Sequence, residues 1–181
     1  MELKTQRLKL RDIVQSDLED LMETYNNLNI VQYLHLSPYP LTQEETLKFI
    51  LEFNEQAKQQ PRTDYNLGID FNSRVIGLIQ LLDTDEFQKT ATLGYSLSEA
   101  YWRQGIATEA VKRGIKFASE ELDLRRIDCE VAIENIPSTK LAEEIGFCLE
   151  GTRKQYRKMK STGKIHDVYI YGLIKEEWED K

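Results

Sequence analysis

The stretch Leu97-Ser-Glu-Ala-Tyr-Trp-Arg-Gln-Gly-Ile-Ala-Thr108 decides the fold, because it joins a strand to a helix through a short loop. An alternating apolar run ends at Leu97, and a helical pattern begins near Gly105. The first turn of a helix has unpaired backbone N–H groups and about half a positive charge, which suits a phosphate or pyrophosphate. Gly105 has no Cβ to keep the backbone away from such a group, and Ala107 keeps the next contact small. The same small residues also suit close packing of a helix on a strand, so the stretch alone leaves both interpretations open.

Hydrophobic periodicity predicts the elements on either side of this stretch. Strands are expected at residues 8–11, 65–71, 74–82, 91–97, 126–133, 147–150 and 166–174. Helices are expected to begin at a Ser16 cap, at a Thr42–Glu45 capping box, at Gly105 and near Pro137, the last one ending before Gly146. Antiparallel strands followed by strand–helix–strand units predict an α/β fold, a mixed sheet with helices on both faces. The length of 181 residues predicts a single domain over residues 1–181.

Composition and charge disfavour several classes of protein. The net charge of −7 argues against a nucleic-acid binder. It mildly favours a cationic substrate through long-range attraction, but acidity that only aids solubility explains this feature better. No stretch approaches the ~20 apolar residues that span a bilayer, and the N-terminus lacks the pattern of a signal peptide, so we expect a cytoplasmic protein with no membrane partner. Cys129 and Cys148 are too few for a disulfide framework and have no metal-ligand spacing around them, so no metal is expected.

Longer motifs add a family resemblance. Tyr101-Trp-Arg-Gln-Gly-Ile-Ala-Thr-Glu-Ala110, followed by Asn135-x-x-Ser138 and Glu144-Ile-Gly-Phe147, resembles the GNAT superfamily of N-acetyltransferases, and within it the RimJ/RimL-like branch. The resemblance covers nearly the whole chain. It implies a GNAT-like, mostly antiparallel sheet whose strands splay into a cofactor groove, and the transfer of acetyl from acetyl-CoA to a primary amine. It also implies a possible homodimer.

The resemblance further implies which residues bind acetyl-CoA. The backbone that holds the CoA pyrophosphate would come from Trp102, Arg103, Gln104, Gly105, Ile106, Ala107 and Thr108. The main chain of Tyr95, Ser96 and Leu97 would pair with pantetheine in the manner of an added strand. Asn135 would hydrogen-bond the cofactor arm, and Ser138 would place a hydroxyl near the thioester sulfur.

The catalytic residues follow less directly. We expect the amine to attack the thioester without an acyl-enzyme, with Ser138 protonating the departing thiolate; a helix cap is the competing role for this serine. The glutamate base of some relatives aligns with Arg157, and the tyrosine acid of many polyamine-acetylating relatives aligns with Ala142. Glu150 and Asp167 remain as candidates for the base, although each also suits an ordinary surface or paired carboxylate.

The acceptor is expected to bind between two loops, residues 30–42 and 156–166, with Tyr33, His35 and Asp167 as contact residues. Because an α-amine has a pKa of about 7.7–8.0 and a lysine one near 10.4, an enzyme without a strong base favours a protein N-terminal α-amine. The alternatives are an enzyme for a polyamine, aminoglycoside or amino-acid-like metabolite, and a non-catalytic acyl-CoA sensor.

Overall fold

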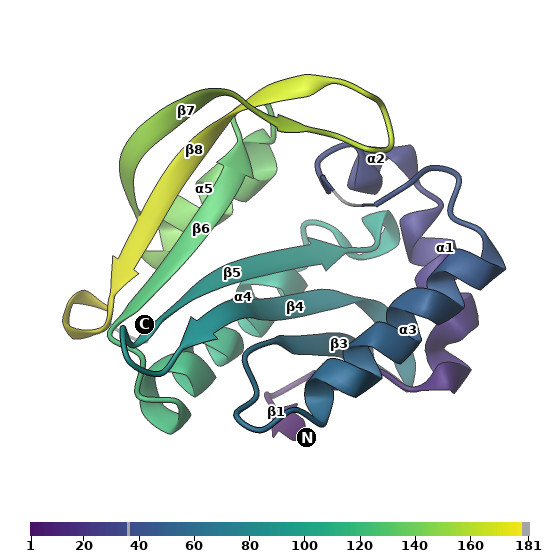
Figure 1. Ribbon diagram of the computed structural model, residues 1–181, viewed down its shortest axis with the longest axis horizontal. Helices are drawn as coiled ribbons and strands as arrows, with labels where there is room; N and C mark the ends of the chain where they lie inside the picture. The colour runs from purple at the N-terminus through teal and green to yellow at the C-terminus, as the bar shows by residue number, and fades with distance from the viewer. Residues whose placement is uncertain (36, 179–181) are drawn as a thin grey trace.

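A computed structural model describes residues 1–35 and 37–178 as an eight-stranded sheet in the order β1-β2-β3-β4-β5-β6-β8-β7 (Figure 1). All neighbouring strands are antiparallel except β5 and β6, which are parallel. The strands are β1 (Glu2–Lys4), β2 (Lys9–Asp12), β3 (Tyr65–Phe71), β4 (Arg74–Asp85), β5 (Thr90–Leu97), β6 (Arg126–Ala132), β7 (Cys148–Lys158) and β8 (Ile165–Ile174).

Helices cover both faces of the sheet. The helices are α1 (Leu18–Tyr25), α2 (Leu28–Val31), α3 (Gln43–Ala57), α4 (Ile106–Lys116) and α5 (Ile136–Ile145). A π-helical turn, Phe117–Glu121, extends α4, and single 3₁₀ turns lie at Gln15–Asp17, Glu99–Tyr101 and Lys175–Glu177. Figure 1 shows α3 in front of the sheet and α4 behind it, and α1 shares a core with α3. Within the described ranges, no helix has the length and apolarity needed to cross a membrane.

Two apolar cores lie on the two faces of the sheet, and a register shift between β3 and β4 changes which side chains of β4 face each one. On β4, Ile79 and Leu81 join the core beneath α4, whereas Val75 and Leu78 join the core beneath α1 and α3. Gly114 lets α4 pack closely, because a Cβ there would lie 3.1 Å from Ile79. The sheet is therefore held from both sides, as burial of two apolar faces requires.

The parallel pair is short. β5 and β6 are in register only from Thr90–Arg126 to Leu93–Cys129. Beyond these pairs the two strands diverge, as Figure 1 shows. We call residues 94–97 of β5 and 130–132 of β6 the divergent strand ends. Along residues 94–97, β5 keeps β4 as a neighbour but has no strand partner toward β6.

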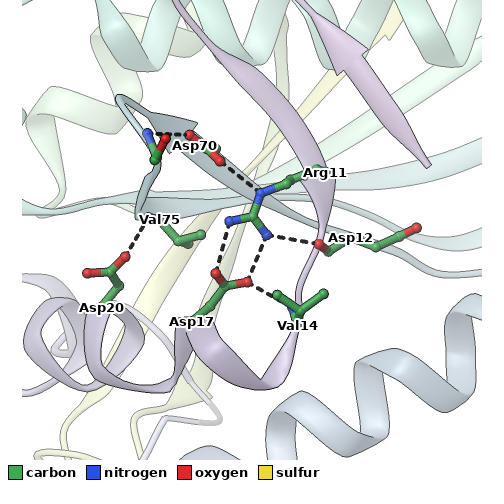
Figure 2. A network of polar contacts seen from close by, with 8 residues as sticks. Arg11, Asp12, Val14, Asp17, Asp20, Asp70 and Val75 are labelled. Carbon is green, nitrogen blue, oxygen red and sulfur yellow. Dashed lines mark hydrogen bonds and ion pairs between the residues drawn. The ribbon is translucent and has the colours of Figure 1, made fainter.

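A buried ion network fixes the first helix to the sheet (Figure 2). Arg11 on β2 donates to both oxygens of Asp17, at 2.8 and 2.9 Å, and to Asp70 on β3 at 2.8 Å. Asp17 also accepts from the N–H of Val14, and Asp70 from that of Ser73. The two carboxylates raise the pKa of Arg11 despite its partial burial. Neither carboxylate is left without partners, as a buried charge requires.

The predicted fold class is confirmed, with differences at particular elements. The capping box of Thr42 and Glu45 forms, with the Thr42 N–H 2.9 Å from the glutamate and the Glu45 N–H 3.2 Å from the threonine hydroxyl. Ser16 does not cap α1: it lies inside the 3₁₀ turn, and Asp17 accepts the Val14 N–H instead. Strand β7 extends to residue 158, and β1 and α2 were not predicted.

Candidate active site

The loop between β5 and α4 ends in a helix start that can hold an anion. Gly105 is the residue before the first turn of α4 and has φ = 71°, a left-handed conformation that favours glycine. Arg103 also has positive φ, 60°. In the described part of the chain no side chain caps this helix, so its first N–H groups point to an uncapped end. Chemically, this end suits a phosphate group.

Arg7 holds the same loop from outside. Its Nη1 donates to the carbonyl of Gln104 at 3.0 Å, and its Nε donates to Glu109 on α4 at 2.6 Å. Glu109 also accepts from the Arg7 N–H and the Thr5 hydroxyl. A Cβ added at Gly105 would lie 3.5 Å from the Arg7 Nη2. The guanidinium therefore stands beside the uncapped helix start, where its charge is paired with that of Glu109 in the first turn of α4.

The end of β5 presents its side chains alternately to the two faces. The Tyr25 hydroxyl of α1 lies 2.5 Å from Ser96 Oγ on one face. On the other face, Tyr95 reaches α5 and Leu97 enters the core beneath α4. Trp102 Nε1 donates to the Leu97 carbonyl at 2.8 Å, which occupies one of the main-chain groups expected to bind a ligand. The main chain of Tyr95 and Ser96 lies along the edge of β5 that has no β6 partner.

A pair of hydroxyls lies at the start of α5. The Tyr95 hydroxyl is 2.7 Å from Ser138 Oγ and 3.1 Å from the Ser138 carbonyl oxygen. The cap of α5 is Asn135, whose side chain accepts from the Ser138 N–H, so Ser138 does not cap this helix. Burial raises the pKa of Tyr95 above its usual value, and the phenol stays protonated at neutral pH. The serine hydroxyl is thus positioned by a neutral phenol and can donate or accept a proton.

A charged cluster lies on the other face of β6 and β7. Glu130 is ion-paired with Arg153 at 3.3 Å and hydrogen-bonded by Arg157, whose Nε is 2.9 Å away. Both guanidinium groups also stack on the Tyr156 ring, 4.7 and 4.4 Å from its centroid. We call Glu130, Arg153, Tyr156 and Arg157 the charged cluster. Its single carboxylate is neutralised by two cations.

Two histidines border this cluster. His166 is buried, and its Nδ1 lies 2.8 Å from Glu134, whose pKa this contact lowers. The Tyr33 ring meets His166 edge-on at 6.0 Å, and the Tyr33 hydroxyl donates to the Glu134 carbonyl at 3.4 Å. Desolvation of the His35 ring, followed by the charge of Arg157, lowers the pKa of His35 and so favours its neutral form. The structure places Tyr33 beside His166, and His35 close enough to Arg157 for its charge to act on the imidazole.

The two carboxylates that the sequence offered as candidates for the base, Asp167 and Glu150, are engaged with other groups of the chain. Asp167 Oδ1 accepts the Gln155 N–H at 2.7 Å, where β7 bulges and Gln155 has φ = 48°. Asp167 therefore shapes the strand that carries the charged cluster. Glu150 is bound by both Nη atoms of Arg126, at 2.8 and 2.6 Å. Arg126 pairs with Thr90, at the closed end of the parallel pair, so the fold does not bring Glu150 to the divergent strand ends, and we withdraw it as the candidate base.

Some residues of the site carried no sequence signal. Arg7, Tyr25 and Glu130 meet their partners only across long stretches of chain, and no local motif marks these contacts. Glu134 stands directly before Asn135, so proximity to the Asn135–Ser138 motif was the one available hint.

Comparison with known proteins assigns the chain to a family. The acetyltransferase (GNAT) domain family matches residues 7–148, so the chain belongs to this family. It is 29% identical over 176 residues to the uncharacterized N-acetyltransferase p20 of Bacillus licheniformis, and the match covers 97% of each chain. It is 26% identical over 145 residues to spermidine N(1)-acetyltransferase of Vibrio cholerae, covering 80% of this chain and 81% of that one. The structure of RimL, the ribosomal L7/L12 alpha-N-protein acetyltransferase in complex with coenzyme A, matches with a TM-score of 0.85 and 25% identity, over 96% of this chain and 98% of that one.

Family membership defines the chemistry of the site. The chain is an acetyl-CoA-dependent N-acetyltransferase of the RimJ/RimL-like branch, as the sequence predicted. Relatives of the chain include enzymes named for ribosomal proteins and for spermidine, so family membership alone does not define the acceptor.

Proposed function

We propose that the chain acetylates the N-terminal α-amine of a protein. The observation that carries this proposal concerns the carboxylates around the divergent strand ends. Glu130 is paired with two arginines, Glu134 contacts His166, and Asp167 accepts a backbone N–H. Each of these three acids is already engaged, which makes it a weak base. An acceptor that needs little help to lose its proton suits such a site.

The pKa of the acceptor decides how much help it needs. With a pKa of about 7.7–8.0, roughly a tenth to a fifth of an α-amine is free base at neutral pH. A lysine or polyamine amine near pKa 10.4 is less than about 0.1% free base. The α-amine thus gains more than about a hundredfold in reactive fraction without any catalytic base.

The donor is assigned to the groups that fit it. The uncapped start of α4 at Gly105, with the backbone of residues 102–108 around it, suits the pyrophosphate of acetyl-CoA. The free edge of β5 at Tyr95 and Ser96 suits the amide groups of pantetheine. Asn135 stands at the start of α5, where its side-chain amide is near the same path.

The reaction then uses two hydroxyls and one backbone edge. The free amine attacks the thioester carbonyl carbon, and a backbone N–H of β5 stabilises the oxyanion. The nitrogen loses its proton to water. As the C–S bond breaks, the Ser138 hydroxyl donates a proton to the thiolate. Tyr95, 2.7 Å from Ser138 Oγ, orients this hydroxyl, and water returns to Ser138 the proton that it took from the nitrogen.

A polyamine is the competing acceptor. Its support is the 26% identity to a spermidine acetyltransferase and the net charge of −7. A thiol-release assay distinguishes the two with three acceptors: a peptide with a free N-terminus, the same peptide with a blocked N-terminus and an internal lysine, and spermidine. We expect turnover with the first peptide alone. Turnover only with spermidine would overturn the proposal.

The pH profile gives an independent check. For an α-amine, kcat/KM should rise about tenfold per pH unit and level off near pH 7.7–8.0. For a polyamine without a catalytic base it should keep rising toward about pH 10. A continued rise with the N-terminal peptide would contradict the proposed role of the free α-amine.

A further inference from the structure

The cations of this acidic chain are concentrated in one hairpin. Residues 153–164, which end β7 and form the turn before β8, contain six of the 24 lysines and arginines and none of the 31 acidic residues. We call this segment the basic hairpin. Its members are Arg153, Lys154, Arg157, Lys158, Lys160 and Lys164. The rest of the chain is therefore more acidic than the net charge of −7 indicates.

Most of this charge is not neutralised within the chain. Among its six cations, Arg153 and Arg157 alone form ion pairs with the described residues, both with Glu130. Lys160 lies close enough to Glu45 to help lower the pKa of that glutamate, after the hydrogen bonds from Thr42. The other three lysines are exposed, and within residues 1–35 and 37–178 none has an ion-pair partner; they are Lys154, Lys158 and Lys164.

The basic hairpin lies beside the region where the acceptor is expected. Its turn contacts the end of α2 and the segment after it, because Ser161 Oγ donates to the Val31 carbonyl at 2.9 Å and the Lys160 N–H to the His35 carbonyl at 3.1 Å. Figure 1 shows the tip of the β7–β8 hairpin next to α2, on the side toward which β5 and β6 diverge. A polypeptide whose first residue reaches the divergent strand ends from this side passes the basic hairpin.

A simpler explanation covers only part of the pattern. β7 is an edge strand, and lysines on an exposed edge protect it from pairing with another chain. That role accounts for Lys154 and Lys158. It does not account for Lys160 and Lys164, which lie in the turn beyond the strand, or for the lack of any acid between residues 153 and 164.

We infer that the basic hairpin binds an acidic stretch of the acceptor protein, a few residues after the amine that is acetylated. This inference rests on the proposed function. Charge complementarity between the hairpin and such a stretch steers the encounter and selects among protein N-termini. The same charges repel spermidine, in agreement with an N-terminal acceptor. The phosphates of an RNA partner would also bind these lysines, but the acidity of the rest of the chain disfavours RNA.

The test compares peptides of equal length that share their first two residues. The following positions carry glutamates, glutamines or lysines. For the unmodified enzyme we expect kcat/KM to be about tenfold higher for the acidic than for the neutral peptide at low salt, with the difference shrinking as salt is added. The basic peptide should be the poorest acceptor.

A triple variant, Lys154→Gln with Lys158→Gln and Lys164→Gln, should lose this preference and leave the neutral peptide unaffected. The matched control replaces three exposed lysines on β2 and α3 and just after α3, namely Lys9→Gln, Lys48→Gln and Lys58→Gln, and should keep the preference. Equal rates for all three peptides, or equal loss in both triple variants, would overturn the inference and leave the N-terminal acceptor intact. Turnover of spermidine but of no peptide would overturn both. Charge-independent peptide rates together with hairpin-dependent binding of an RNA oligonucleotide would replace the acidic peptide by a nucleic acid.

Discussion

At the scale of single residues, the contact between Tyr95 and Ser138 makes the sharpest prediction. Ser138→Ala removes the proposed proton donor, and kcat should fall about a hundredfold while the Kd of acetyl-CoA stays nearly unchanged. Tyr95→Phe should give a smaller loss, because the serine hydroxyl remains but loses its partner 2.7 Å away. Thr139→Ala is the control, since the neighbouring hydroxyl bonds the Asn135 carbonyl instead. An unchanged kcat in Ser138→Ala would remove its catalytic role.

Arg7 makes a second prediction at this scale. Arg7→Gln removes the guanidinium that binds the Gln104 carbonyl and Glu109, beside the uncapped start of α4. We expect the Kd of acetyl-CoA to rise about tenfold, equivalent to about 1.4 kcal/mol, as measured by calorimetric titration. Arg113→Gln is the control on the same helix, because Arg113 contacts Lys4 and Glu121 instead. If both variants bind acetyl-CoA equally well, Arg7 has no role in donor binding.

At the scale of the elements, the bulge of β7 depends on one carboxylate. Asp167→Ala removes the acceptor of the Gln155 N–H, so the strand should relax and misplace Arg153, Tyr156 and Arg157. The KM of the peptide acceptor should rise several-fold with no change in acetyl-CoA affinity. Asp167→Asn keeps an oxygen in place and should restore the KM. A KM that rises equally in both variants would point to the charge of Asp167 acting on the acceptor directly.

The sequence predicts elements to the extent that their pattern repeats. β3, β4, β5, α3 and α4 were predicted because each shows a clear period or a capping box. The three-residue β1 and four-residue α2 are too short to show a period. β7 is exposed along nearly its whole length, so no apolar alternation marks its extension to residue 158.

The residues of the site likewise fall into two groups: those that a local motif marks, and those that only the folded sheet brings together. The loop before α4 and the Asn135–Ser138 turn are continuous in the chain, and the family motif predicts a binding role for both. The pairs Tyr95–Ser138 and Arg157–Glu130 exist only after β5, β6 and β7 are assembled. Glu150 shows the limit of sequence position as a guide. It lies a few residues after the motif, yet its strand carries it to Arg126 at the far end of the sheet.

At the scale of the whole molecule, the Arg11 network should dominate the effect of charge on stability. Arg11→Met leaves Asp17 and Asp70 buried without their cation, and the free energy of unfolding should fall by about 2–3 kcal/mol. The melting temperature should drop by several degrees in calorimetry. Arg74→Met, which breaks an exposed pair with Asp20 and Glu23, should have a much smaller effect. Equal losses would show that burial does not strengthen the Arg11 network.

The brief register between β5 and β6 has a consequence for how the polypeptide could be divided. One continuous half of the backbone forms β1 to β5 and α1 to α4, on one side of the β5–β6 pair. The other half forms β6, α5, β7 and β8, on the other side. Four residue pairs of the sheet join the halves. Cutting the connection after Leu122 should therefore yield two complementary fragments. A donor lying along both unpaired strand ends would bridge them, so their reassembly would report the presence of acetyl-CoA.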